Sequence, residues 1–293
     1  MRLGYSITSA HPPDVPAREA AASVVDRATA ARDAGVDYVQ CGDHHAVRSG
    51  QYLQSVPTAG RLAGVFDHVA ALALLPLYDP LTLAEQVGTL AALADDFDLW
   101  CGLGHEPSSF RAFGVPMAER APRFEEALDL LTRLWSAESV TFDGEFYAVE
   151  EAAVNPKPGA DVRVCVGAGA EPAVRRAGRL GDAWVVSPAE SLAEIDRKRE
   201  WFEAAGGGDV VARRDALCLP DGERARDLAA DLLADGYRGW GPDAPVLAGD
   251  AADVAAALDD LADRGVSEVV VRPMAGEHAV ETLETVAAGR DRR

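Results

Sequence analysis

Two adjacent histidines stand where an apolar strand is expected to end. His44 and His45 follow Asp43, which comes directly after the apolar stretch Tyr38 to Gly42. Charged and imidazole groups are poorly suited to packing at the end of a buried strand. An imidazole titrates near neutral pH, so the same position suits acid–base chemistry.

Two glycine-rich segments follow apolar strands in the same way. One is Cys101 to Glu106, with the sequence CGLGHE, and the other is Val164 to Gly169, with the sequence VCVGAG. Polar or glycine-rich groups at the carboxyl ends of successive strands are typical of the active face of an α/β barrel.

Strands and helices alternate along the whole chain. The pattern predicts eight strands and therefore a closed parallel (β/α)8 TIM barrel, with an open doubly wound sheet as the structural alternative. The expected strands are Leu3 to Ile7, Asp37 to Gly42, His68 to Leu75, Phe97 to Leu103, Val162 to Val166, Ala183 to Val186, Val210 to Leu219 and Glu268 to Val271. The expected helices include Pro16 to Ala34, one opening at Asp79-Pro80, one from Pro122 with Phe124, Leu128, Leu131 and Trp135 inside, Pro172 to Leu180, Leu192 to Ala204, Arg224 to Leu233 and Ala251 to Asp263.

The alternation is interrupted once, after the helix that starts at Pro122. Residues Thr141 to Tyr147 place a hairpin turn between two arms that carry aromatic residues. We interpret residues 137–160 as an insertion, so that residues 1–293 form a single barrel domain.

Composition and charge exclude several classes of protein. The chain is 48% hydrophobic, but no run approaches the roughly 18 apolar residues that span a bilayer, and no signal peptide is expected. Four scattered cysteines indicate buried thiols in a reducing cytoplasm. The net charge of −20 makes nucleic acid and anionic membranes unfavourable partners.

Lysine is almost missing from this acidic chain, which has only Lys157 and Lys198. A surface rich in aspartate suits a halophilic cytoplasm, where salt screens the repulsion between carboxylates. The other explanation is an ordinary acidic enzyme from an organism with a GC-rich genome.

Several motifs, taken in order, resemble the bacterial luciferase-like superfamily. The motifs are Leu74 to Pro80, Phe110 to Pro116, Glu119-Arg120, Arg123 to Leu128 and Gly178 to Trp184, together with the hairpin insertion. The resemblance covers most of the chain. It implies a barrel that binds FMN or its deazaflavin analogue, coenzyme F420, at the carboxyl ends of the strands.

The resemblance implies a site in which His44 lies near the cofactor ring and relays or donates a proton during hydride transfer. The other interpretation of His44 is a residue that caps the strand through a backbone hydrogen bond. His45 either contacts substrate or supports the loop. The cofactor contacts implied along the next strands are Ala71, Leu72, Ala73, Leu103, Gly104 and His105. Relatives often have a non-prolyl cis peptide bond in the strand that contains Ala71.

A glycine-containing segment before an expected helix is a candidate phosphate site, both by the resemblance and by its local chemistry. Gly167, Ala168, Gly169 and Ala170 precede the helix expected from Pro172. Glycine permits close approach of the backbone, and a helix N-terminus favours a phosphate. The segment is either a cradle for the phosphate that FMN and F420 both carry or a plain connection.

One position departs from the family pattern. His105-Glu106 stands where relatives often carry an aromatic residue followed by arginine, so no known substrate preference can be transferred. Metal binding is not expected, because Asp43, His44 and His45 in an extended chain cannot all face one ion.

We therefore expect a cytoplasmic, homodimeric oxidoreductase that transfers a hydride between F420 and a small organic substrate. F420 is favoured because a halophilic archaeon would make it and because Asp-His after the second strand is frequent among F420-dependent relatives. The alternatives are an FMN-dependent monooxygenase that uses dioxygen and a non-catalytic flavin-binding relative. A metal hydrolase barrel is the interpretation that would remain if the motifs were set aside.

Overall fold

The computed structural model describes residues 1–48, 50–158 and 162–293 of the chain. Its main sheet has nine strands that pair in the order β10-β9-β6-β5-β3-β1-β13-β11-β12, and β10 also pairs with β11. The eight strands from β10 to β11 therefore close into a ring, which is the barrel predicted from the alternation, and β12 is a ninth strand beside β11. The expected open doubly wound alternative is excluded by this closure.

The barrel strands are β1 (Arg2–Ile7), β3 (Tyr38–Cys41), β5 (His68–Leu74), β6 (Asp96–Gly102), β9 (Arg163–Gly167), β10 (Ala183–Val186), β11 (Asp209–Cys218) and β13 (Glu268–Pro273). Each overlaps a predicted strand. Most of their residues are apolar because both faces of a barrel strand are covered; every residue of β3 and of β10 is buried.

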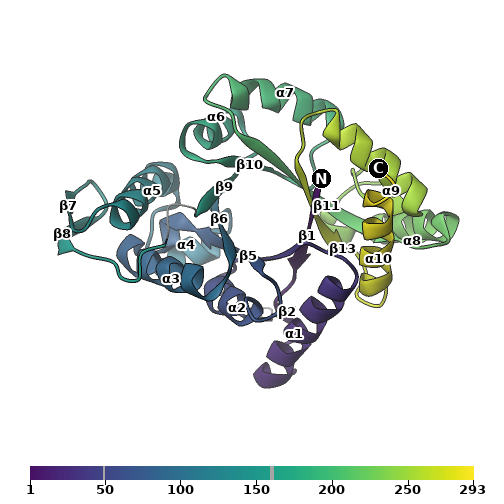
Figure 1. Ribbon diagram of the computed structural model, residues 1–293, viewed down its shortest axis with the longest axis horizontal. Helices are drawn as coiled ribbons and strands as arrows, with labels where there is room; N and C mark the ends of the chain where they lie inside the picture. The colour runs from purple at the N-terminus through teal and green to yellow at the C-terminus, as the bar shows by residue number, and fades with distance from the viewer. Residues whose placement is uncertain (49, 159–161) are drawn as a thin grey trace. The chain divides into compact units, whose positions relative to one another are not determined.

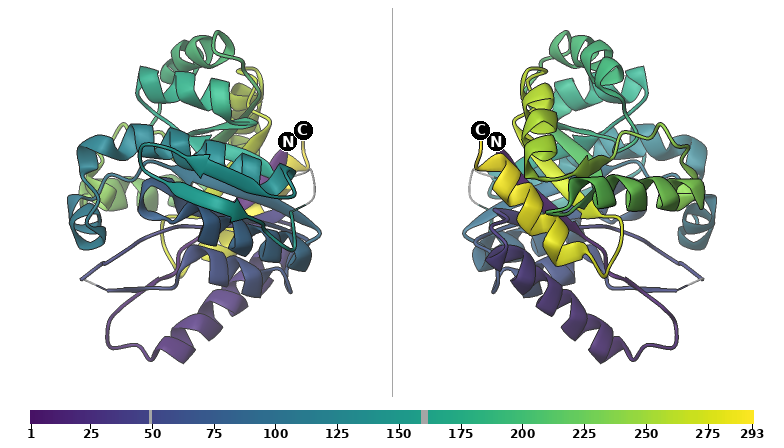
Figure 2. Two further views of the ribbon diagram at one scale, coloured as in Figure 1. Left: turned by 90° about the vertical axis from the view of Figure 1, so that its left-hand side faces the viewer. Right: turned by 90° about the vertical axis from the view of Figure 1, so that its right-hand side faces the viewer.

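The chain divides into two compact units. Unit 1 contains Met1–Ile7, Asp26–Val39 and Val166–Arg293. It carries α6 (Glu171–Leu180), α7 (Leu192–Glu203), α8 (Gly222–Ala234), η3 (Tyr237–Gly239), β12 (Leu247–Gly249), α9 (Ala251–Ala262) and α10 (Ala279–Arg290), as labelled in Figure 1. Helices α9 and α10 lie side by side in the right-hand view of Figure 2.

Unit 2 contains Thr8–Val25 and Gln40–Cys165. It carries β2 (Ala10–His11), β4 (Gln51–Tyr52), α2 (Ser55–Leu62), η1 (Leu75–Leu77), α3 (Pro80–Leu93), α4 (Pro107–Phe113), η2 (Met117–Glu119), α5 (Arg120–Ser136), β7 (Val140–Asp143) and β8 (Ala148–Ala152). Helix α1 (Ala17–Asp33) contributes residues to both units.

The predicted hairpin is the antiparallel pair β7–β8, drawn in teal in the left view of Figure 2. Gly144 in its turn approaches Glu126 of α5 so closely that a Cβ there would lie 2.2 Å from Oε1 of Glu126. The Glu126 carboxylate accepts hydrogen bonds from the amides of Glu145, Phe146 and Tyr147 at 3.0, 2.8 and 2.8 Å. The end of the predicted insertion, residues 159 and 160, lies outside the described residues.

Some predicted boundaries were wrong. Helix α5 begins at Arg120 rather than at Pro122, because proline is tolerated in a first turn, where amides have no helical acceptor. Leu134, not Trp135, continues its buried face. Helix α8 begins at Gly222 rather than Arg224, and its N-cap Asp221 accepts from the Arg224 amide. Helices α2, α4 and α10 and strand β12 were not predicted.

The cysteines behave as expected: all four are free and buried. Burial raises the pKa of Cys41 and of Cys218 to about 12, so these thiols stay protonated at neutral pH. Among the described residues, no helix is both long and apolar enough to cross a membrane.

Candidate functional site

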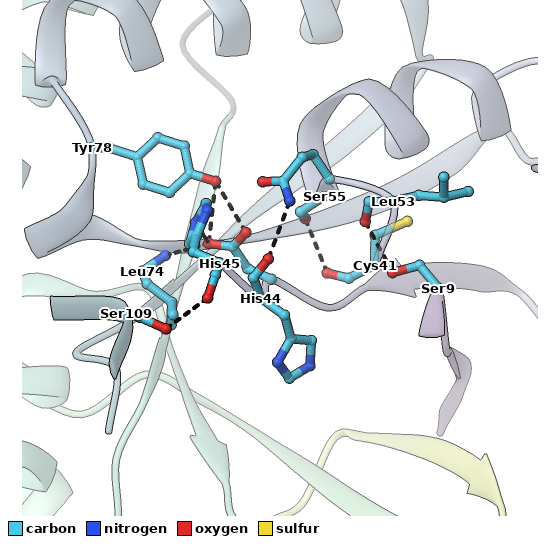
Figure 3. A network of polar contacts seen from close by, with 11 residues as sticks. Ser9, Cys41, His44, His45, Leu53, Ser55, Leu74, Tyr78 and Ser109 are labelled. Carbon is cyan, nitrogen blue, oxygen red and sulfur yellow. Dashed lines mark hydrogen bonds and ion pairs between the residues drawn. The ribbon is translucent and has the colours of Figure 1, made fainter. Parts of the chain in front are cut away.

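A buried carboxylate organises the loop that follows β3. Asp43 is 3% exposed, and its Oδ2 accepts a hydrogen bond from the Leu74 amide at 2.9 Å. The Tyr78 hydroxyl donates to the same carboxylate at 3.1 Å, and Nε2 of His45 lies 3.0 Å from Oδ2. Figure 3 shows these contacts converging on one point. A carboxylate with three donors is well satisfied in its ionised form.

Tyr78 serves this network as a permanent donor. Burial, together with the charge and hydrogen bond of Asp43, raises the pKa of the phenol well above its ordinary value of 10. The hydroxyl therefore stays protonated under physiological conditions and keeps donating to Asp43.

The His45 side chain is held on several sides. It is 9% exposed, and its ring makes edge contacts with Tyr78 and Phe113 at centroid distances of 5.4 and 5.1 Å. The Ser109 hydroxyl donates to the His45 carbonyl at 2.7 Å. The contact between Nε2 and Asp43 fixes the orientation of the ring. His45 is thus an anchored residue.

His44 lies in the opposite situation. The residue is exposed, and its ring points away from the His45 and Tyr78 side chains (Figure 3). It lies against the Tyr52 ring at a centroid distance of 4.5 Å. Its carbonyl accepts a hydrogen bond from Gln54 Nε2 at 3.1 Å. Neighbouring residues of an extended chain face opposite sides, so one histidine is anchored and the other reaches solvent.

The predicted cofactor contacts on β5 differ in burial because successive side chains of a strand point to opposite faces. Ala71 and Ala73 are fully buried, whereas Leu72 is half-buried. A Cβ built on Gly102 would lie 3.6 Å from Leu72, so Leu72 faces the end of β6. The peptide bonds of this strand are trans; the cis bond found in the described residues is Asn155–Pro156.

The residues after β6 lie on an accessible turn. Leu103 and Gly104 are half-buried and His105 is exposed. Gly104 has a φ of +74°, and a Cβ there would lie 3.1 Å from the Phe110 ring, so this position requires glycine. His105 precedes Glu106, the N-cap residue of α4.

The predicted phosphate cradle joins β9 to α6 in unit 1. Ala168 is fastened to β10: its amide donates to the Val185 carbonyl at 3.3 Å, and its carbonyl accepts from Trp184 Nε1 at 2.8 Å. Gly167 and Ala170 are exposed and Gly169 is half-buried. A rigid anchor between accessible residues suits a loop that presents backbone amides at a helix N-terminus.

The charges beside this cradle are balanced. A Cβ on Gly169 would lie 3.3 Å from Oε1 of Glu190, and Glu190 pairs with Lys198. Glu171 in the first turn of α6 pairs with Arg175 at 2.8 Å. Each carboxylate has its own cation, so neither places an unpaired negative charge beside this helix N-terminus.

A pocket that the sequence did not reveal opens beside the loop of His45. It is lined by Ala46, Arg48, Ser108, Arg111 and Ala112. Arg111 belongs to the motif Phe110 to Pro116, but nothing in the sequence places it next to Arg48. Asp43 was likewise recognised as part of a motif and not as the centre of a network, because its partners Leu74 and Tyr78 lie 31 and 35 residues away.

One cluster of the described residues has spacing that could hold a metal ion: His68, Asp96 and Asp98. Nε2 of His68 lies 3.4 Å from Asp98, and Arg163 Nη1 also lies 3.4 Å from Asp98. An arginine already supplies a positive charge to this carboxylate. The cluster lies at the start of β5 and β6, where barrel residues stabilise the fold.

Comparison with known proteins identifies the family. Residues 1–288 match the family model described as luciferase-like monooxygenase, so the chain belongs to this family. The F420-dependent glucose-6-phosphate dehydrogenase of Kineococcus radiotolerans is 29% identical over 224 residues, which are 70% of this chain and 64% of that protein. The chain therefore spans less than two thirds of this curated relative.

Two solved structures share the fold. An F420-dependent secondary alcohol dehydrogenase in complex with an F420-acetone adduct superposes with a TM-score of 0.79 at 18% identity, covering 99% of each chain. The oxygenating constituent of 3,6-diketocamphane monooxygenase from Pseudomonas putida, in complex with FMN, has a TM-score of 0.80 at 17% identity and covers 98% of this chain and 97% of that one. These likenesses confirm the barrel.

Proposed function

We propose that this protein is an oxidoreductase that uses F420 to transfer a hydride to or from a small organic substrate. The observation that carries the proposal is the arrangement of Asp43, His44 and His45, in which one imidazole is exposed and its neighbour is fixed to a buried carboxylate. The family and its F420-dependent relative support the same activity.

His44 is the proposed acid–base residue. Bound F420 would supply the chemistry of hydride donation or acceptance. In the oxidation of an alcohol, a hydride and a proton leave the substrate, and the proton needs an acceptor near neutral pH. An accessible imidazole provides one. In the reverse direction the protonated ring returns the proton.

The neighbouring residues are proposed to position the site. Asp43 holds His45 and the Leu74 amide at the end of β5, so the loop that carries His44 stays attached to that strand. The backbone from Ala71 to Ala73 and Leu103 to His105 is proposed to line the cofactor ring, and Gly167 to Ala170 to hold its phosphate. The proposed phosphate site is supported by the accessible Gly167 and Ala170 at the N-terminus of α6.

A second candidate is an FMN-dependent monooxygenase that uses dioxygen. It is favoured by the family description and by the FMN-bound structure with the same fold. The amides of the cradle accept either phosphate, so they do not separate the two cofactors.

The deciding experiment is a titration of the purified protein with F420 and, separately, with FMN, followed by absorbance and fluorescence. We expect saturable binding of F420 and at least tenfold weaker binding of FMN. Binding of FMN alone would replace the proposal with the monooxygenase. Absence of binding of either cofactor would refute both.

We further propose a cytoplasmic homodimer adapted to high salt. Four free buried thiols are consistent with a reducing compartment, and the charge of −20 is consistent with a salt-screened surface. Size-exclusion chromatography tests the assembly, and melting curves across a range of salt concentrations test the salt adaptation.

A further inference from the structure

Unit 1 gathers three arginines, two on the parallel strands β11 and β13 and one in η3. In the register of β11 and β13, Arg213 lies opposite Val270 and Asp215 opposite Arg272. Opposite residues of a ladder share a face, and so do residues two apart on one strand. Arg213, Asp215 and Arg272 therefore lie on one face. Arg272 is the penultimate residue of β13, near the end at which barrels place their chemistry.

The guanidinium of Arg213 is poorly satisfied. Its Nε is buried without a hydrogen-bond partner among the described residues, and its Nη2 reaches only the Ser6 hydroxyl, at 3.5 Å. Burial lowers the pKa of Arg213 to about 10; the charge of Asp215 opposes this shift, and the charges of Arg238 and Arg272 act in the same direction as burial. The group is still a cation at pH 7, and its buried Nε lacks an acceptor among the described residues, which is unfavourable.

The single carboxylate that the described residues place in this cluster is already engaged. Asp215 is 1% exposed, and it accepts from the Tyr237 hydroxyl at 2.7 Å and from Arg238 Nη1 at 2.9 Å. Arg238 is thus paired with Asp215, and Arg213 and Arg272 lie on the same strand face as this carboxylate. In a chain with a net charge of −20, a local excess of positive charge indicates that an anion completes the site.

Arg238 is brought to this place by an unusual backbone. It has a φ of +53° within the short η3 segment, a conformation that costs free energy for a residue other than glycine. Its guanidinium is fixed by Asp215 and lies 4.7 Å from the centroid of the Trp240 ring. The segment therefore holds a cation at the cluster in spite of backbone strain.

We propose that Arg213, Arg238 and Arg272 bind an anionic group of the substrate, a carboxylate or a phosphate ester. A guanidinium presents a planar pair of donors that matches either group, and both Arg213 and Arg272 are only half-buried, so a ligand can reach them. This inference rests on the proposed function, because it names the substrate class of that oxidoreductase: small organic anions.

The phosphate of the cofactor is a second anion that the arginine cluster could bind. That group has its own proposed site at Gly167 to Ala170, a loop that follows β9, whereas the arginine cluster lies on β11 and β13. Removal of an arginine should therefore weaken binding of a free anion and leave cofactor binding unchanged.

The test is isothermal titration of the full-length protein with inorganic phosphate at constant ionic strength, with parallel titration of F420. Arg272→Gln and Arg213→Gln should each weaken phosphate binding at least tenfold and change F420 binding less than twofold. Arg272 is the safer substitution because it lies at a strand end, and circular dichroism checks that it folds. Arg197→Gln removes the same charge from the exposed face of α7 and should leave both affinities within twofold.

A variant that is expected to bind phosphate more tightly strengthens the test. Asp215→Asn removes the competing negative charge and should tighten phosphate binding, which loss of structure would not do. Absence of saturable phosphate binding to the wild type, or equal binding by all the arginine variants, would overturn the proposal. An Arg272→Gln variant that loses F420 as strongly as phosphate would assign the cluster to the cofactor instead. Failure of F420 to bind the wild type would refute the proposed function. The F420 titration measures this separately from phosphate binding.

Discussion

At the scale of single residues, the adjacent histidines His44 and His45 have different environments. His45 is fixed by Asp43, Tyr78 and Ser109, whereas His44 is exposed beside Tyr52. The difference arises because successive side chains of an extended segment diverge, and the buried carboxylate can reach only one of them.

His44→Ala should lower turnover by about a hundredfold or more, the typical contribution of a general acid or base. The fold should persist because the ring is exposed. Steady-state kinetics and a melting curve measure the two effects. His278→Ala, which removes a partly exposed histidine paired with Glu281, serves as the control. Turnover within twofold of the wild type would remove His44 from the mechanism, and loss of cofactor affinity alone would make it a binding residue.

Asp43→Asn should lower the free energy of unfolding by about 1–3 kcal/mol, the cost of leaving buried donors without their acceptor. One carbonyl oxygen cannot serve the Leu74 amide, the Tyr78 hydroxyl and His45 as the carboxylate does. Denaturant unfolding measures the loss.

Asp79→Asn is the matched control for that substitution. Asp79 caps α3 by accepting from the Thr82 amide, and asparagine caps a helix about as well as aspartate. Equal stability of the Asp43 and Asp79 variants would show that the network around Asp43 contributes nothing.

At the scale of elements, the barrel carries the proposed functional groups in the segments that leave the carboxyl ends of strands. The loop after β3 carries His44, and the loop between β9 and α6 carries the proposed cradle. A different device holds the inserted hairpin, whose turn amides are bound by a carboxylate on α5.

Gly169→Val should weaken cofactor binding at least tenfold while the melting temperature of the apoprotein changes little. A β-branched side chain blocks close approach of a phosphate to the backbone, and the nearest neighbour of the new Cβ is the end of the Glu190 side chain, which can move. Fluorescence titration measures the affinity. Gly64→Val, where the nearest atoms to a new Cβ lie 3.7 Å away, should bind normally. Equal affinities in all three proteins would place the phosphate elsewhere.

Glu126→Ala should release the hairpin turn without unfolding the barrel, because it removes the acceptor of three amides. Hydrogen exchange at Glu145, Phe146 and Tyr147 should accelerate at least tenfold, a fold-change that corresponds to about 1.4 kcal/mol of local stability. Glu126→Gln keeps one carbonyl acceptor, so its exchange rates at these amides should lie between those of the alanine variant and the wild type. Unchanged exchange in the alanine variant would contradict the proposed role of this contact.

At the scale of the whole molecule, the net charge of −20 is the dominant property. Surface carboxylates repel one another in dilute buffer, and salt shortens the range of that repulsion to roughly 3 Å near 1 M. The same charge disfavours nucleic acid and anionic membranes as partners.

We expect the melting temperature and the activity to rise between low salt and molar potassium chloride, and the proposed homodimer to dissociate first as salt is removed. Melting curves and size-exclusion chromatography across this range measure both effects. At pH 5, closer to the pI of about 4.6, the salt dependence should shrink because fewer carboxylates are charged. A melting temperature that is flat or falls with salt would favour an ordinary acidic enzyme and shift the expected cofactor toward FMN.

The sequence by itself determined the periodic part of the fold. Strands such as Ala183–Val186 are continuous apolar runs, so their positions were predicted, and eight of them implied a barrel. Elements without a clear period were missed. Strand β12 has three residues, and α2 has eight, including a proline and a glycine. Helix α10 has buried residues spread around it rather than along one stripe.

The tertiary structure alone decided which functional groups meet. Periodicity reports the local conformation, but a parallel barrel joins strand ends that are far apart in the chain. Asp43 reaches Tyr78 across 35 residues, and Arg213 reaches Ser6 across 207. The sequence located His44, His45 and the glycine-rich loop as candidates because each lies directly after a strand. It could not reveal that Asp43 also binds the Leu74 amide and the Tyr78 hydroxyl, or that Arg238 pairs with Asp215, because those contacts form only when distant segments of the chain lie side by side.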